Sequence, residues 1–222
     1  MWNLATRQPA GVSPPVGAAL SGRVRGVAFS PDGNLLAIAY GGGAVLLWDP
    51  ARGQTAGVTL RAGTGSGGAY GVAFSPDGKL LATAYGGGTV RLWNPATGLP
   101  FGAPLRADTG TGLGVNAVAF SPDGKLLATA DGDGTVRLWD PATGQPVGAP
   151  HPADTGPGGV KGVAFSPDGK LLAAAGADGT VRTWQISLFA DPYAALCADV
   201  GPPTQAEWTQ NAPGELQPSV CG

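Results

Sequence analysis

Residues 72–94 read Val-Ala-Phe-Ser-Pro-Asp-Gly-Lys-Leu-Leu-Ala-Thr-Ala-Tyr-Gly-Gly-Gly-Thr-Val-Arg-Leu-Trp-Asn, and this stretch decides the fold because it occurs four times. The other copies are residues 27–49, 118–140 and 163–185. Their phenylalanines stand at positions 29, 74, 120 and 165, which gives steps of 45, 46 and 45 residues. A fixed period in this range predicts a repeat architecture.

Within one copy, apolar runs alternate with turn signals. Ser121-Pro122-Asp123-Gly124 predicts a tight turn, because proline presets φ and glycine takes the positive φ that closes a hairpin. Further turns are expected at residues 131–134 and 141–144. Strands are expected between them, at residues 115–120, 126–130, 135–139 and 145–150. Each copy is therefore predicted to be a four-stranded antiparallel meander, which buries both faces only when copies stack around an axis as a β-propeller.

The pattern Val-x-Phe-Ser-Pro-Asp-Gly, Leu-Leu-Ala, Gly-x-Val-x-Leu-Trp-Asp resembles the WD40 repeat family over residues 24–186. The resemblance implies an all-β propeller that displays loops to a protein partner. The family's Trp-Asp pair stands at residues 48–49 and 139–140, but residues 93–94 are Trp-Asn and residues 184–185 are Trp-Gln. The family's Gly-His pair is missing, so its buried Asp-His-Ser/Thr-Trp network is not expected here.

The composition argues against two classes of partner, nucleic acids and membranes. Only 13% of residues are charged and the net charge is −2, with no cluster of basic residues, which argues against nucleic acid as a partner. No apolar run approaches the roughly 18 residues that span a bilayer, and no signal peptide is recognised, so a cytoplasmic location and no membrane contact are expected. The chain has 39 glycines and 21 prolines, and they fall at repeated turn positions. We therefore expect an ordered chain and not a disordered one.

The repeats divide the chain into three parts. Residues 1–21 align with the end of a repeat and are predicted to be a closing strand, residues 22–186 hold the four repeats, and residues 187–222 are predicted to be a short helical tail. Three assemblies stay open: a four-bladed ring, a homodimer that completes an eight-bladed ring, and a fragment of a longer propeller.

The tail carries the only two cysteines, Cys197 and Cys221. Its Leu-Cys, Glu-Trp, Pro-Gly and Cys arrangement resembles the tail that follows WD repeats in large bacterial signalling proteins of the STAND type. That resemblance favours a disulfide between the two cysteines, whereas a cytoplasmic setting favours free thiols, and the sequence leaves both open.

Candidates for chemistry are few. His151 is the only histidine and aligns with leucines of other copies, so we interpret it as half-buried or at the surface. Asp131-Gly-Asp133 lacks the distal glutamate of a calcium loop and is interpreted as a turn. No catalytic residue, metal site or cofactor is therefore predicted.

Positions that differ among near-identical copies indicate where the scaffold does not dictate the residue. The start of the first strand carries Arg25, Tyr70, Asn116 and Lys161. The end of the second strand carries Tyr40 and Tyr85 in two copies and aligns with Ala130 and Ala175 in the others. The hypothesis is a partner-binding patch made of Arg25, Tyr40, Tyr70, Tyr85, Asn116 and Lys161.

The sequence thus predicts a non-enzymatic WD40 scaffold for protein–protein interaction, and the tail suggests a detached sensor module of a bacterial signalling protein. The alternatives are a propeller enzyme that uses its central channel and a folded gene remnant without independent function.

Overall fold

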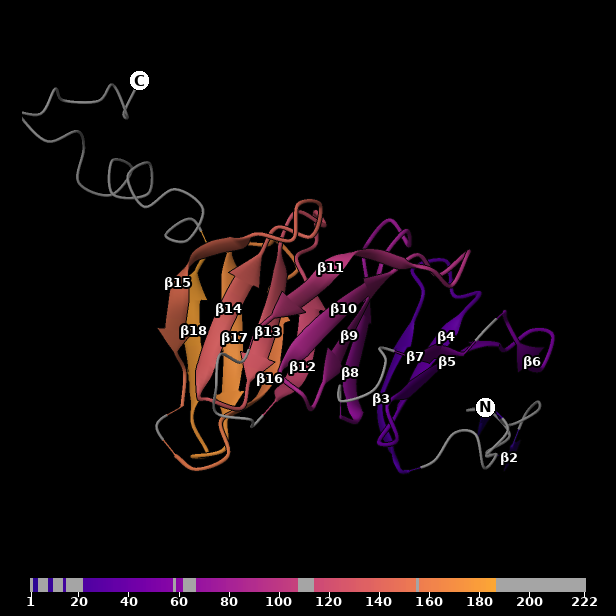
Figure 1. The fold of residues 1–222 in the computed structure, drawn as a ribbon, viewed down its shortest axis with the longest axis horizontal. Helices are drawn as coiled ribbons and strands as arrows, with labels where there is room; N and C mark the ends of the chain where they lie inside the picture. The colour runs from indigo at the N-terminus through magenta and orange to yellow at the C-terminus, as the bar shows by residue number, and fades with distance from the viewer. Residues whose placement is uncertain are drawn as a thin grey trace, which may run out of the picture.

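The computed structural model is all-β in the part of the chain that it describes, which is residues 2–3, 8–9, 14, 22–57, 59–61, 67–107, 114–154 and 156–186. Four antiparallel sheets follow one another in chain order, from the indigo first sheet to the orange fourth (Figure 1). Each sheet is one blade and corresponds to one repeat. The predicted helical tail, residues 187–222, lies outside the described residues.

Each blade begins with an inner strand and continues outward through hairpins. The strands of the first blade are β3 (Val24–Phe29), β4 (Leu36–Tyr40), β5 (Ala44–Asp49), β6 (Gln54–Thr55) and β7 (Leu60–Arg61). Those of the second are β8 (Ala69–Phe74), β9 (Leu81–Tyr85), β10 (Thr89–Trp93) and β11 (Pro100–Arg106). Those of the third are β12 (Val115–Phe120), β13 (Leu127–Asp131), β14 (Thr135–Trp139) and β15 (Pro146–Pro152). Those of the fourth are β16 (Val160–Phe165), β17 (Leu171–Gly176) and β18 (Val181–Gln185).

The predicted four-stranded meander is complete in the second and third blades. In the first blade the fourth strand is split, because β6 and β7 pair with opposite ends of β5. The fourth blade has three strands in the described part of the chain. The short strands β1 (Trp2–Asn3) and β2 (Gln8–Pro9) pair with each other in a sheet of their own. Most of residues 1–21 lie outside the described ranges, so their closing role stays a prediction.

The Ser-Pro-Asp-Gly turns have the predicted geometry. Gly124 takes a φ of 73°, and Gly124 N donates a hydrogen bond of 2.9 Å to Ser121 O. The Ser121 hydroxyl donates to Asp123 Oδ1 at 2.6 Å and accepts from Leu126 N at 2.9 Å. The serine and aspartate thus fasten the hairpin that joins the first two strands of a blade.

The core lies between neighbouring blades. One cluster joins the first and second blades, one the second and third, and one the third and fourth. The tryptophans near the ends of the third strands are nearly inaccessible in the first three blades, with Trp48, Trp93 and Trp139 at 4%, 4% and 5% exposure. Each blade therefore buries its faces against its neighbours, as a β-propeller requires. In the described residues, no helix is long and apolar enough to cross a membrane.

Candidate partner-binding site

The start of every inner strand is a β-bulge. In the first blade the register with β4 skips from Val24 to Gly26, and the other three blades repeat this shift. The skipped residues are Arg25, Tyr70, Asn116 and Lys161. A bulge takes one residue out of the ladder and re-aims its side chain. These four predicted site residues therefore occupy equivalent places in the four blades, and we call them the bulge row.

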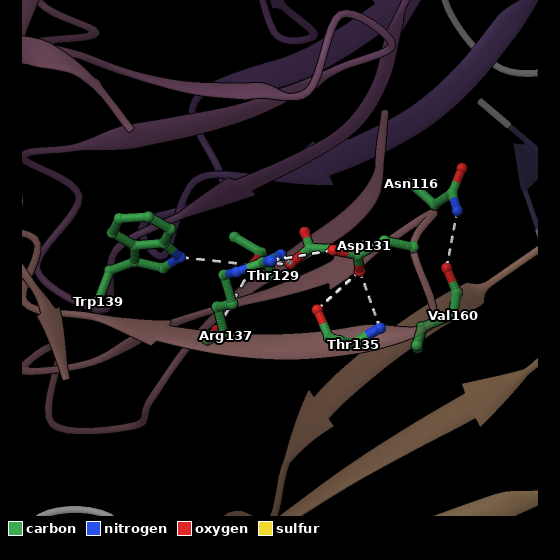
Figure 2. Close-up of polar contacts among 8 residues, drawn as sticks. Asn116, Thr129, Asp131, Thr135, Arg137, Trp139 and Val160 are labelled. Carbon is green, nitrogen blue, oxygen red and sulfur yellow. Dashed lines mark hydrogen bonds and ion pairs between the residues drawn. The ribbon is translucent and has the colours of Figure 1, made fainter. Parts of the chain in front are cut away.

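Side chains of the bulge row link neighbouring blades. The guanidinium carbon of Arg25 lies 5.4 Å from the centre of the Tyr70 ring, which is cation–π geometry. Asn116 Nδ2 donates a hydrogen bond of 2.7 Å to the backbone oxygen of Val160 in the fourth blade (Figure 2). Lys161 Nζ donates to Gly158 O at 2.5 Å. Arg25 and Lys161 are exposed and Tyr70 and Asn116 are half-buried, so the row is accessible to a partner.

Two of the predicted site residues are not on the surface. Tyr40 is 2% exposed and Tyr85 is 0% exposed. Tyr40 packs in a cluster within the first blade, and Tyr85 packs in the cluster between the first and second blades. Both tyrosines are core residues, so their assignment to the partner-binding patch is wrong.

The strand register corrects the alignment of the two tyrosines. The residues opposite the start of the inner strand are Tyr40, Tyr85, Asp131 and Gly176. Ala130 and Ala175 stand one position earlier. Because side chains alternate between the faces of a strand, a slip of one residue compares opposite faces.

In the third blade this position belongs to a polar network (Figure 2). Trp139 Nε1 donates to Thr129 Oγ1 at 3.4 Å, and Thr129 Oγ1 donates to Asp131 Oδ2 at 3.2 Å. Arg137 closes the network through ion pairs of 2.6 Å with Asp131 and 2.9 Å with Asp133. A histidine network was not expected from the sequence, and here an arginine from the neighbouring strand supplies the cation instead.

The network encloses a carboxylate. Asp131 is 0% exposed, and this burial raises its pKa to about 7, although the hydrogen bonds and charge of Arg137 and the Thr129 hydroxyl oppose the shift. Asp133 Oδ1 also accepts hydrogen bonds from Thr135 N at 3.0 Å and from Thr135 Oγ1 at 2.7 Å. Asp131 Oδ2 and both oxygens of Asp133 thus have partners in this chain, whereas Asp131 Oδ1 is buried without a hydrogen-bond partner among the described residues.

The second blade has the same scaffold without the carboxylate. Thr83 Oγ1 and Trp93 Nε1 are buried and have no hydrogen-bond partner among the described residues. The Arg91 guanidinium carbon lies 5.7 Å from the Trp93 ring centre. Replacing Asp131 by Tyr85 at the equivalent place therefore exchanges a polar network for aromatic packing.

The other polar side chains that the sequence offers for chemistry lie in strand β15 and in the turns of the four blades. His151 is half-buried in β15, pairs with Val136 of β14, and has a pKa lowered by burial. Asp32, Asp77, Asp123 and Asp168 are turn residues, and in each the largest cause of a lowered pKa is the hydrogen bond from the serine of its own turn. In the described part of the chain, no group of three or more His, Cys, Asp or Glu side chains could hold a metal ion. Cys197 and Cys221, proposed as a disulfide pair, lie outside it.

The comparison with family models matches four stretches of the chain to the WD domain, G-beta repeat. The matched residues are 16–49, 57–94, 102–140 and 150–185, which correspond to the four blades. The comparison with curated proteins found no match. More than half of the chain is thus covered by the family model, and the chain belongs to the WD40 repeat family.

Proposed function

We propose that this WD40 chain is a non-enzymatic scaffold that binds a protein partner through the bulge row. WD40 domains generally mediate protein–protein interactions. One observation carries the choice of site: in every blade the residue that the bulge removes from strand pairing is one that differs between the copies. The sheet therefore holds the backbone of this residue in place and leaves its side chain free to be chosen for a partner.

The chemistry of the row indicates the kind of partner surface that would fit. Arg25 and Lys161 contribute two exposed cations, and the row contains no acidic residue. Tyr70 adds a half-buried aromatic side chain, and tyrosine and arginine are common where binding energy concentrates. A protein segment that carries carboxylates beside an apolar side chain is complementary to this surface.

We also propose a biological role and a location for the chain, both from its sequence. The resemblance of residues 187–222 to the tail of bacterial signalling proteins supports a detached sensor module, and a cytoplasmic setting is part of the same proposal. No specific observation favours the alternatives of a channel enzyme or a gene remnant.

The experiment compares three immobilised baits: the wild-type chain, the double variant Tyr70→Ala with Lys161→Ala, and Leu99→Ala. Leu99 is 64% exposed and lies in the turn before β11, so the third bait controls for loss of an exposed side chain elsewhere. A protein retained by the wild type and Leu99→Ala but lost with the double variant is then purified and titrated by calorimetry. We expect its Kd to rise at least about tenfold in the double variant.

Two outcomes would contradict the proposal. One is that all three baits retain the same proteins equally well. The other is that the double variant unfolds, which would make the bulge row a structural feature.

A further inference from the structure

We infer that two copies of this chain close one eight-bladed ring, in which the free face of the fourth blade packs on the inner strand β3 of the other copy. The inference concerns assembly and does not rest on the proposed function. The three contacts between successive blades use equivalent residues each time. The first and fourth blades carry the same residues on faces that are exposed.

The fourth blade exposes a face that is buried in the other blades. Its members are Ala173, Ala175, Val181 and Thr183. The valine shows the contrast most clearly, because Val45, Val90 and Val136 are each 0% exposed whereas Val181 is 69% exposed. In the first three blades this face supplies the apolar side chains that pack on the next blade. The fourth blade therefore carries an interface without its partner.

Among the described residues, no blade packs against the inner strand of the first blade on its other side. Val24 on β3 is 54% exposed, although its equivalents Ala69, Val115 and Val160 are each 0% exposed. Val27 and Phe29 of the same strand are 59% and 57% exposed. The outer part of this face, which includes Ile38 and Trp48, is buried at 4% exposure. The free surface is thus the inner strand itself.

A series of glycines shows where the next inner strand would lie. A Cβ built at Gly26 would lie 2.9 Å from Tyr70 O, and one at Gly71 would lie 3.0 Å from Ala117 Cα. The inner strands of successive blades thus approach closely at these two glycines, whereas the equivalent residue of the third blade is Ala117. A Cβ at Gly162, the equivalent residue of the fourth blade, would meet no atom of the described residues within 4 Å. The close approach is built into the fourth blade, but its neighbour is missing.

The glycines of the Ser-Pro-Asp-Gly turns indicate the same blade-to-blade contact, here from the side of the first blade. A Cβ at Gly78 would lie 3.6 Å from Pro31 Cδ of the preceding blade, and Gly124 and Gly169 repeat this contact with Pro76 at 3.5 Å and Pro122 at 3.6 Å. Gly33 of the first blade has no such neighbour among the described residues. Pro167 is the equivalent proline of the fourth blade. Placing Pro167 of one copy against Gly33 of the other would continue the series without a break.

A groove at the end of the molecule supports this reading. Between the second and third blades, Asp77, Lys79 and Leu80 face Asp123 and Pro141 across a groove of about 540 Å³. The equivalent residues Asp168, Lys170 and Leu171 line a groove of about 630 Å³ on the fourth blade, together with Gln185 and Ile186 of that blade. Among the described residues, the lining of this second groove contains none from another blade.

The number of copies in the ring follows from the way each blade packs on the next. Contacts between inner strands run in chain order from β3 to β8, β12 and β16, and the exposed ends show that the first and fourth blades are not packed face to face. The same step continued through a second copy adds four blades at a time. Propellers typically have four to eight blades, so eight is the ring that two such copies complete.

The test is the mass in solution, measured by light scattering and sedimentation velocity over a wide range of concentrations. The wild-type chain should weigh twice its 21.9 kDa. Val181→Asp places a carboxylate in the proposed contact and should raise the dimer Kd by about a hundredfold or more. Leu99→Asp is the matched control, because Leu99 is 64% exposed but lies away from both end faces, and it should stay dimeric.

Gly162→Leu supplies a second, independent disruption. A Cβ at Gly162 meets no atom of the described residues within 4 Å, so a leucine there should leave the melting temperature of the monomer close to that of Val181→Asp. In the ring the leucine would meet the inner strand of the other copy and should prevent dimer formation. Circular dichroism of each variant confirms that it is folded.

The inference is overturned if the wild-type chain is a monomer at every concentration, or if Val181→Asp and Gly162→Leu remain dimeric. Dissociation by Leu99→Asp as well would show that the dimer uses another surface. Growth into open assemblies larger than two copies would refute ring closure.

Discussion

Replacing Tyr85 by alanine should separate a core role from a surface role for this residue. Tyr85 is 0% exposed and is the bulkiest side chain among those that are almost wholly buried. It packs with Leu47, Leu60 and Trp93 in the cluster that joins the first two blades. Tyr85→Ala would therefore open a cavity at a contact between blades, where backbone sheets on both sides limit collapse.

The expected loss follows from the size of the side chain. Truncating a buried aromatic side chain to alanine typically costs about 3–5 kcal/mol of unfolding free energy. For a chain of this size, each kcal/mol lowers Tm by about 2–4 °C, so Tyr85→Ala should lower Tm by roughly 6–20 °C. Tyr70→Ala removes a half-buried ring whose contact with Arg25 is worth about 1 kcal/mol, so its Tm should fall by only a few degrees.

Thermal unfolding by circular dichroism and urea titration would measure both variants at one fixed protein concentration, since association shifts Tm. Tyr85→Phe is the matched control, because it keeps the ring and should change the unfolding free energy by about 1 kcal/mol or less. The reasoning is refuted if Tyr85→Ala melts within two degrees of wild type, or if Tyr70→Ala is the more damaging change.

Two further predictions concern the polar network of the third blade. The pKa of Asp131 is about 7 in the folded chain and about 4 when unfolded, so the folded state holds the proton more tightly and the unfolding free energy should fall as pH rises from about 4 to about 7. Urea titrations at a series of pH values should show this slope in the chain that keeps Asp131 and not in Asp131→Asn. Both chains carry His151→Gln, because the lowered pKa of His151 adds a slope of the opposite sign below about pH 6.5. An equal slope in both chains would assign the titration elsewhere. Thr129→Val should cost about 1–3 kcal/mol by leaving Trp139 and Asp131 unsatisfied, whereas Thr83→Val, at a hydroxyl without a partner among the described residues, should be neutral or stabilising. Equal losses in the urea midpoints of the two variants would contradict this.

The sequence predicted the blades because their information is local. Alternating apolar residues, the Ser-Pro-Asp-Gly turn and the tryptophan recur in every copy, and each acts within a few residues of itself. The split fourth strand of the first blade lies where the local signals fade. In the first blade, residues 54–61 contain only two short paired segments, β6 and β7, on either side of Gly57.

The site was predicted only in part, because variation among copies has two physical causes. Arg25, Tyr70, Asn116 and Lys161 vary since a bulge frees them from pairing. Tyr85 and Asp131 vary since each is matched to its own buried neighbours. The sequence carries such a signal for Tyr40, which is accompanied by Ile38 and Leu46. It carries none for Tyr85, because Thr83 and Arg91 accompany Tyr85 just as Thr129 and Arg137 accompany Asp131.

Ring closure is the step that a repeat sequence encodes least directly. Every copy carries both halves of the blade interface, so the sequence specifies how one blade meets the next and does not say which blade is last. The end faces differ from the internal ones mainly at Thr183, which stands where Leu47, Leu92 and Leu138 are buried. An unpartnered face of this kind persists only if it is covered or tolerated. Val181 and Gly162 retain the internal pattern on that face, so the same contact that joins blades within the chain is available to join two chains.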